Sequence, residues 1–191
     1  MKTIDNVYLD QLEINKSKFL SFAYPVSDET HAKEILNSKK LEYKDATHVC
    51  FGLVLSSPRL EKCSDDGEPS GTAGKPILEL IKKKDLENVL IIVVRYFGGK
   101  KLGAGGLIRA YTNSAKLVID KAHIIESFPK TKYVAIVELH SLDRIKRLIS
   151  SLGGEILNID FGERAEITFE IKSDCDIPNN LKEKCKWKLQ N

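Results

Sequence analysis

The sequence has few cysteines and no long hydrophobic run. Its four cysteines include no Cys-x-x-Cys pair, and they are too sparse for a secreted disulfide scaffold, so we expect reduced thiols. No stretch reaches the about 18 consecutive apolar residues that a membrane-spanning helix needs. Asp5, Asp10 and Glu13 interrupt the region where a signal peptide would be continuously apolar. The sequence therefore predicts a cytoplasmic protein.

Several enzyme motifs are also absent. The sequence contains no GxxxxGK[ST] phosphate loop, no GxSxG hydrolase motif and no HExxH metalloprotease motif. The net charge of +3 is too small to identify a polyanionic partner, because binding to nucleic acid depends on where the basic residues cluster. The motifs of these enzyme classes are therefore missing, the sequence suggests no cofactor, and whether the protein is an enzyme stays open, with a non-enzyme favoured.

The first part of the chain alternates strand and helix patterns. Residues 89–97, VLIIVVRYF, form a continuous apolar run, which is typical of a strand covered on both faces. A helix from about 28 should be capped by Ser27 or Asp28, and Pro76 suits the first turn of another. The remaining expected elements are strands at 18–26, 48–55 and about 60–63, and a helix from about Leu107 to His123.

The last part of the chain reads as a separate domain. Pro129 lies in a linker at 127–131, and KYVAIVELH then begins a new strand pattern. A helix, LDRIKRLISSL, should be capped by Ser141 and ended by Gly153 and Gly154, and a hairpin turning at Gly162 follows. The final segment, LKEKCKWKL, suggests a second helix. We therefore predict two α+β domains, 1–128 and 129–191, the second a ferredoxin-like βαββα unit without a clear last strand.

A glycine-rich turn follows the apolar strand. In RYFGGKKLGAGGLIRAY the glycines lie between a strand and a helix, an arrangement that directs backbone N–H groups and a positive helix end at an anion. Tight packing at a corner explains the same glycines equally well. The candidate anion-binding residues are Arg95, Gly98, Gly99, Lys100, Lys101, Gly103, Gly105, Gly106 and Arg109.

The segment from 56 to 76 is a long loop that is rich in Ser, Gly, Pro and Asp. Loops of this length in a compact domain are usually functional. Asp65, Asp66 and Glu68 are candidate ligands of a divalent metal, although their spacing favours a hydrogen-bonded turn. Ser70, Thr72 and Lys75, before the next helix, can contact phosphate oxygens if this loop folds beside the glycine turn.

His48 and Cys50 share one face of a predicted strand. Catalysis by a thiol and an imidazole needs hydrogen-bond contact and an orienting third group, and the sequence indicates neither. A buried cysteine that packs as a small hydrophobic residue is the favoured interpretation.

Two of these motifs carry a family resemblance. DDGEPSGTAGKPIL and VVRYFGGKKLGAGGLIRAY, together with KSKFL and DATHVC, resemble the IMPACT family and its bacterial YigZ-type members over about residues 15 to 123. The resemblance implies an N-terminal "domain 2-like" fold, similar to the second domain of a small-subunit ribosomal protein and of elongation factor G. It also implies a ferredoxin-like C-terminal domain. The ribosomal protein and the elongation factor both handle RNA or the ribosome. The resemblance further implies a role in translation, because eukaryotic family members act in the control of translation initiation by competing for the activator of a kinase.

Three functions remain in competition. The leading hypothesis is a non-enzymatic, translation-associated protein that binds RNA, the ribosome or another phosphate-rich partner through its N-terminal domain. The second is a metal-dependent enzyme that handles a nucleotide or phosphate, with Mg²⁺ held by Asp65, Asp66 and Glu68. The third is a module that docks onto a protein partner without binding nucleic acid.

Overall fold

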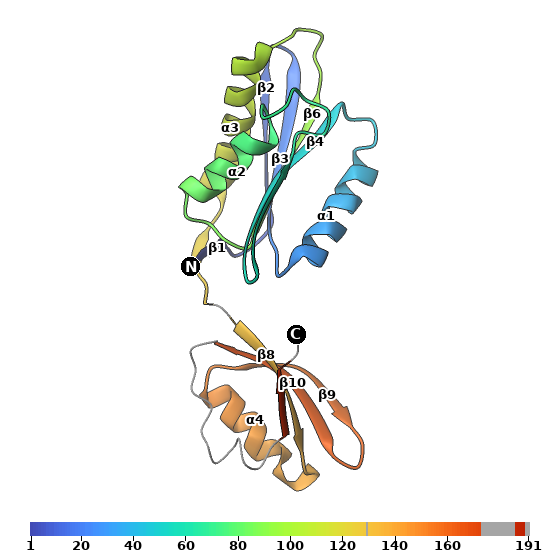
Figure 1. Ribbon diagram of the computed structural model, residues 1–191, viewed down its shortest axis with the longest axis vertical. Coiled ribbons are helices and arrows are strands. Elements are labelled where there is room, and N and C mark those ends of the chain that lie inside the picture. The colour runs from blue at the N-terminus through green and yellow to red at the C-terminus, as the bar shows by residue number, and fades with distance from the viewer. Residues whose placement is uncertain (129, 173–185, 190–191) are drawn as a thin grey trace. The chain divides into compact units, whose positions relative to one another are not determined.

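The structure is a computed structural model that describes residues 1–128, 130–172 and 186–189 (Figure 1). The chain divides into two compact units, Met1–Ser127 and Phe128–Asn191. None of the helices in these described ranges is long and apolar enough to cross a membrane.

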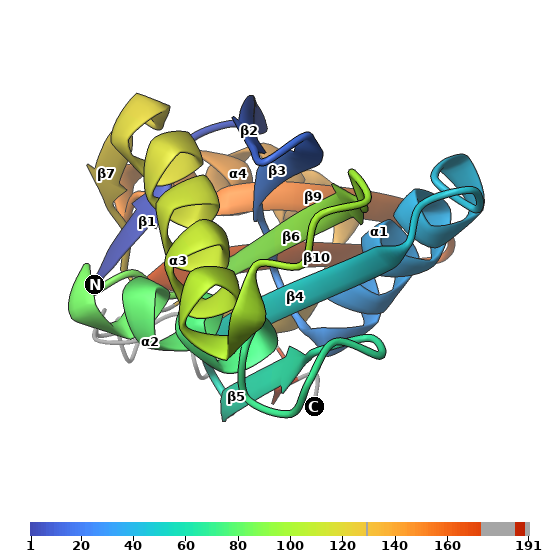
Figure 2. The ribbon, with the colours of Figure 1, turned by 90° about the horizontal axis from the view of Figure 1, so that it is seen from above.

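The first unit is a five-stranded antiparallel sheet with helices on both faces. Its strand order is β2-β3-β6-β4-β5. The strands are β2 (Tyr8–Ile14), β3 (Ser17–Pro25), β4 (His48–Ser56), β5 (Arg59–Ser64) and β6 (Val89–Tyr96). The helices are α1 (Glu29–Glu42), α2 (Gly74–Lys83) and α3 (Gly103–Lys121). Helices α2 and α3 cover one face of the sheet and α1 covers the other, as Figures 1 and 2 show.

The central strand β6 has both of its faces buried. Val89, Ile91 and Val93 pack in the core beneath α2 and α3. The alternate residues Leu90, Ile92 and Val94 pack in the core on the α1 side of the sheet. Because side chains alternate across a strand, only a continuous apolar run can fill both cores. The structure confirms the prediction made from this run.

Local signals in the sequence set the ends of the helices. Asp28 caps α1, since its Oδ1 accepts a hydrogen bond from the His31 backbone N–H at 2.9 Å. Pro76 lies in the first turn of α2, where its missing N–H has no cost. Both predictions are confirmed.

A two-stranded ribbon that the sequence did not reveal joins the ends of this unit. Strand β1 (Lys2–Ile4) pairs antiparallel with β7 (Ile124–Glu126), after α3 has ended at Lys121. Met1 and Ser127 extend the ribbon: the N-terminal ammonium donates to the Ser127 carbonyl at 3.1 Å, and the Ser127 N–H donates to the Met1 carbonyl at 2.8 Å. The two ends of the unit are therefore side by side.

The second unit is a four-stranded antiparallel sheet with strand order β11-β8-β10-β9. Its elements are β8 (Lys130–Val137), the short 3-10 turn η1 (Leu139–Ser141), α4 (Leu142–Ser151), β9 (Glu155–Phe161), β10 (Ala165–Lys172) and β11 (Lys186–Leu189). Gly153 follows α4 with a positive φ of 70°, as a helix-ending glycine does. Ser141 precedes α4, but its side chain makes no capping hydrogen bond, because η1 leads directly into the helix.

The prediction of a second helix at LKEKCKWKL is wrong for residues 186–189, the part of this segment that the structure describes. Residues 186–189 form β11, which pairs antiparallel with β8, whereas 181–185 lie outside the described residues. Lys-Trp-Lys-Leu alternates polar and apolar residues with period two, and the outer edge of β8 offers unpaired backbone groups to it. The last strand, which the sequence left in doubt, is therefore β11.

Candidate functional site

The acidic loop, residues 65–73 between β5 and α2, contains the three carboxylates Asp65, Asp66 and Glu68. Its first residue, Asp65, bonds to the backbone at the start of α2. Asp65 accepts hydrogen bonds from the backbone N–H groups of Gly71 (2.8 Å), Ala73 (3.0 Å) and Gly74 (2.8 Å). Burial alone would raise the pKa of Asp65, but these three N–H donors outweigh it and hold the pKa below its usual range. The positive end of α2 is thereby already neutralised by a carboxylate of the protein.

Asp66 fastens the same loop to the sheet and to α1. Its Oδ2 accepts from the Val49 backbone N–H at 2.7 Å, and its Oδ1 accepts from Lys40 Nζ at 2.9 Å. Burial acts to raise the pKa of Asp66, and the bonds from Lys40 and Val49 lower it further than burial raises it. Asp66 is a structural anchor.

The third carboxylate of the loop, Glu68, is buried in a polar network. Its Oε1 accepts from Arg95 Nη1 at 2.6 Å and from the Tyr111 hydroxyl at 2.7 Å, and His48 Nε2 lies 3.8 Å from its Oε2. Arg95 Nη2 also donates to Ser17 Oγ at 3.4 Å. Since the three carboxylates serve three different sets of partners, they do not converge. Across the described ranges, no group of three or more His, Cys, Asp or Glu side chains could hold a metal.

Cys50 and His48 do not form a catalytic pair. The Cys50 thiol donates to the Asp65 carbonyl at 3.0 Å and lies 3.5 Å from the Tyr111 hydroxyl, whereas His48 Nδ1 donates to the Asp66 carbonyl at 2.8 Å. Burial raises the pKa of Cys50 to about 12 and also raises that of Tyr111. Cys50 is therefore a protonated, buried thiol, as the sequence interpretation favoured.

The glycine turn is partly architectural. A Cβ on Gly98 would lie 2.0 Å from the Lys16 carbonyl carbon, so only glycine fits beside the turn between β2 and β3. Gly99 and Gly103 have positive φ values of 83° and 69°, which glycine adopts without strain. Gly105 differs, because an added Cβ would meet nothing within 4 Å. Packing does not account for this last glycine.

A hollow of about 340 Å³ opens where α3 begins. Leu102, at the cap position of α3, has no side chain that could satisfy the first N–H groups, and the first turn of the helix contains no acidic residue. The residues that line the hollow come from the acidic loop, the end of β6 and the start of α3: Glu68, Pro69, Arg95, Phe97, Lys101, Leu102, Gly103, Ala104 and Leu107. The acidic loop and the glycine turn thus meet at one place.

Only part of the predicted anion-binding set lies there. Arg95, Lys101 and Gly103 line the hollow. Arg95 is only 4% exposed and is already paired with Glu68, so Lys101 is the exposed cation in the lining of the hollow. Lys100 and Arg109 are exposed outside the lining. Phe97 and Glu68 were missed as members of this site; an aromatic residue directly before the glycines was the available signal.

The residues from the end of the acidic loop lie elsewhere. Lys75 lines a separate hollow of about 460 Å³ beside α2 and α3. The Thr72 hydroxyl is buried and donates to the Pro69 carbonyl at 2.6 Å. Ser70 is exposed and lines neither hollow. These three residues do not extend the lining of the hollow at α3.

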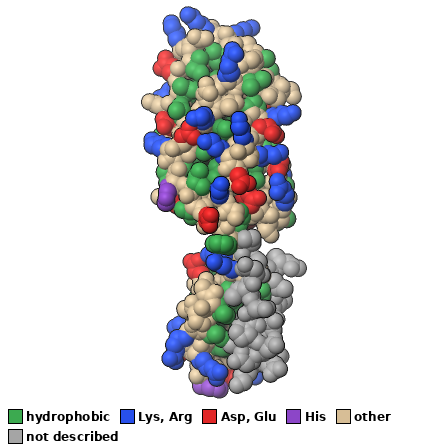
Figure 3. Space-filling model, turned by 90° about the vertical axis from the view of Figure 1, so that its left-hand side faces the viewer, with side chains coloured by type: hydrophobic (Ala, Val, Ile, Leu, Met, Phe, Trp, Pro, Cys, Tyr) green, Lys and Arg blue, Asp and Glu red, His purple; other side chains and the backbone are tan. Residues whose placement is uncertain are grey.

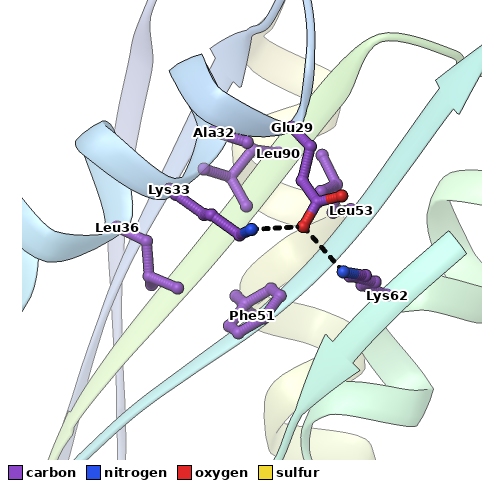
Figure 4. Close-up of a pocket in the computed structure, with 8 residues that line it drawn as sticks. All are labelled: Glu29, Ala32, Lys33, Leu36, Phe51, Leu53, Lys62 and Leu90. Carbon is purple, nitrogen blue, oxygen red and sulfur yellow. Dashed lines mark hydrogen bonds and ion pairs between the residues drawn. The ribbon is translucent and has the colours of Figure 1, made fainter. Parts of the chain in front are cut away.

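A smaller apolar hollow of about 160 Å³ lies on the α1 side of the sheet (Figure 4). Glu29 bridges Lys33 (2.6 Å) and Lys62 (2.7 Å) at its edge, and hydrogen bonds from these lysines lower the pKa of Glu29 to about 2. Its apolar lining is Ala32, Leu36, Phe51, Leu53 and Leu90. It is a surface depression closed by charge pairs and independent of the glycine turn.

The fold defines an α+β protein with a five-stranded first unit and a smaller, β-rich second unit. Residues 15–119 match the Impact N-terminal domain. YigZ of Escherichia coli (strain K12), an IMPACT family member, is 35% identical over 152 residues, which are 78% of this chain and 74% of that protein. The chain belongs to the IMPACT family, as its motifs predicted.

Two further relatives extend the comparison. YvyE of Bacillus subtilis (strain 168), also an IMPACT family member, is 44% identical over 117 residues, which are 61% of this chain and 54% of YvyE. The match therefore spans about half the length of that relative. A crystal structure of a hypothetical protein is similar along the chain, with a TM-score of 0.72, 26% identity and coverage of 100% of this chain and 97% of its own.

Proposed function

We propose that this protein is a non-enzymatic, translation-associated binding protein of the cytoplasm whose first unit holds phosphate groups of RNA or of the ribosome. The observation that carries the proposal is the hollow at the start of α3, where uncapped backbone N–H groups meet the exposed Lys101. The translation-associated part rests on the family resemblance.

The charges of the hollow favour an anion. Glu68 is neutralised by its bonded partner Arg95, which leaves the positive charge of Lys101 and the positive end of the α3 dipole. The comparison with α2 is instructive, because Asp65 supplies that helix with the carboxylate that α3 lacks. A phosphate oxygen at α3 would take the same position relative to the helix.

Gly105 supports the same proposal. A glycine inside a helix costs about 0.5–1 kcal/mol relative to alanine, and no neighbouring atom requires one here. A bare backbone in the first turn lets a phosphate approach its N–H groups closely. The site would be local, since Figure 3 shows basic side chains scattered among acidic ones on the face that it displays.

The experiment is a binding assay with structured RNA and ribosomal particles over a series of salt concentrations. We expect the Lys100→Glu/Lys101→Glu variant to bind more weakly and its salt slope to fall by roughly one for each lost phosphate contact. Lys2→Glu/Lys44→Glu is a matched control, because it makes the same charge change at two exposed lysines that do not line the hollow.

The assay also separates the two competing functions. Binding that the Lys100/Lys101 reversal leaves unchanged would contradict the proposed site. Salt-insensitive binding to a protein, with no binding to RNA, would favour a docking module, for which the apolar hollow beside α1 is the supporting observation. Thermal stabilisation by a nucleotide with Mg²⁺ would instead favour an enzyme.

We also infer the finer fold assignments. In the second unit β8 and β10 are neighbours in the middle of the sheet, with β9 and β11 at its edges, and this split arrangement supports a ferredoxin-like domain. For the first unit, the "domain 2-like" assignment and a boundary at 128/129 rest on the family resemblance and on the linker sequence. A superposition on an elongation factor structure would test them.

A further inference from the structure

Phe97 is unusual among the aromatic residues of the first unit because 46% of its surface is exposed. It directly follows β6, whose residues from Val89 to Arg95 are buried, and it lines the hollow together with Lys101. Its backbone N–H donates to Thr47 Oγ1 at 2.9 Å. The Phe97 ring is therefore presented to the hollow from a fixed backbone rather than from a loose loop.

Arg95 provides an independent sign of a ligand. Its Nε is buried and has no hydrogen-bond partner in the part of the chain that the structure describes. A buried donor without a partner is destabilising, and natural proteins keep such groups mainly where something else satisfies them. Arg95 also lines the hollow, and its guanidinium carbon lies 5.5 Å from the centre of the Phe97 ring. The exposed Lys101, an aromatic ring and an uncapped helix end are thus within one hollow.

We propose that this hollow binds one nucleotide of single-stranded RNA, with its phosphate at the first turn of α3 and its base stacked on Phe97. The inference rests on the proposed function and adds the class of RNA to it. Aromatic rings beside backbone-tracking cations are the usual way to hold single strands, because every base has a π-face that can stack.

The size of the hollow sets a limit on the ligand. At about 340 Å³ it lies near the lower end of the range for small-molecule sites, about 300–1,000 Å³. A base within a duplex is already stacked on both sides and must leave the helix before it can enter a protein pocket. The site therefore selects single strands over duplexes and has little preference for sequence.

The test uses fluorescently labelled oligonucleotides and the full chain. Three ligands are compared: an unstructured octauridylate, the same strand with abasic residues, and a duplex of matched length. The proteins are the wild type, Phe97→Ala, Phe97→Tyr, Lys100→Glu/Lys101→Glu and Phe161→Ala. Phe161 is a matched control, since it is an exposed phenylalanine of the second unit. Thermal unfolding checks that each variant is folded.

We expect Phe97→Ala to weaken binding of octauridylate by about 5- to 150-fold, the range found for loss of one stacked base. Phe97→Tyr should retain the affinity, Phe161→Ala should not change it, and Phe97→Ala should leave the weaker binding of the abasic strand unaltered. Equal losses for intact and abasic strands, or no loss for either, would overturn the stacking.

The outcomes also separate the two proposals. Loss of binding in Lys100→Glu/Lys101→Glu, together with unchanged binding in Phe97→Ala, would support the proposed phosphate site and contradict base stacking on Phe97. If the wild type binds ribosomal particles but none of the three ligands, only the single-strand proposal fails; if it binds neither, both proposals fail. Adenosine 5′-monophosphate is tested separately by thermal unfolding: stabilisation by it, with no binding of the strands, would reassign the hollow to free nucleotides.

Discussion

Arg95 Nη1 lies 2.6 Å from Glu68 Oε1, and the two side chains are 5% and 3% exposed. This ion pair joins the central strand of the sheet to the acidic loop, and it is almost completely shielded from water. Breaking a buried pair by removing one partner leaves the other charge without compensation, which typically costs about 3–5 kcal/mol.

We therefore expect Glu68→Gln to lower the free energy of unfolding by about 3–5 kcal/mol, measured by urea denaturation. Glu61→Gln is the matched control, because Glu61 pairs with Arg59 and Lys82 at a half-buried surface position, where its side chain is 28% exposed, and its loss should have little effect. Similar stability of Glu68→Gln and the wild type would mean that the buried charge finds another partner.

Two glycines of the turn should respond in opposite ways to alanine. Gly98→Ala places a Cβ against the Lys16 backbone and should destabilise the protein by at least about 1–3 kcal/mol. Gly105→Ala meets no atom and should stabilise it by about 0.5–1 kcal/mol while weakening RNA binding. Thermal unfolding and the salt-series assay measure the two effects. A Gly105→Ala variant that is more stable and binds equally well would remove this glycine from the site.

Asp65 should make stability depend on acid pH. Its pKa in the folded protein is below the value of about 4 for an unfolded chain, so its contribution is present above pH 4 and is lost as the pH falls through the folded value. Asp65→Asn should be less stable than the wild type at pH 7 by about 1–2 kcal/mol, the cost of a lost helix cap. The difference should shrink as the pH falls below about 4 and towards the lowered pKa of the folded state. A difference that is constant with pH would assign the loss to geometry instead of charge.

The two described cysteines should differ in reactivity. Cys50 is fully buried with a pKa of about 12, whereas Cys63 is exposed. Because the thiolate is the reactive form, iodoacetamide at pH 8 should label Cys63 in the native protein and spare Cys50. Peptide mapping by mass spectrometry locates the label, and the unfolded protein is the control in which both react. Equal labelling in the native state would contradict the buried network around Cys50.

Local patterns were sufficient to predict the centre of the fold. The continuous apolar run of β6 indicated a strand with two covered faces, and Asp28 and Pro76 marked helix ends. These signals are local because side-chain alternation and capping depend on residues a few positions apart. The segment at 186–189 was assigned to a helix because its strand character depends on pairing with β8, which is distant in the sequence.

The site was predicted only in outline. The sequence placed cations and glycines at the start of α3. It could not reveal that Arg95 is hydrogen-bonded to Glu68, or that Gly98 packs against the backbone of Lys16. Both relationships join segments that are far apart along the chain, and burial decides them. The sequence therefore located the turn, whereas the role of each residue within it depends on the tertiary fold.

The ribbon of β1 and β7 gives the first unit a property of its own. Met1 and Ser127 exchange two backbone hydrogen bonds, so the polypeptide enters and leaves this unit at one corner. A module with adjacent ends can be grafted into a surface loop of a host protein without stretching either chain. The adjacent ends of the unit thus meet the geometric requirement for its insertion into a surface loop of another protein.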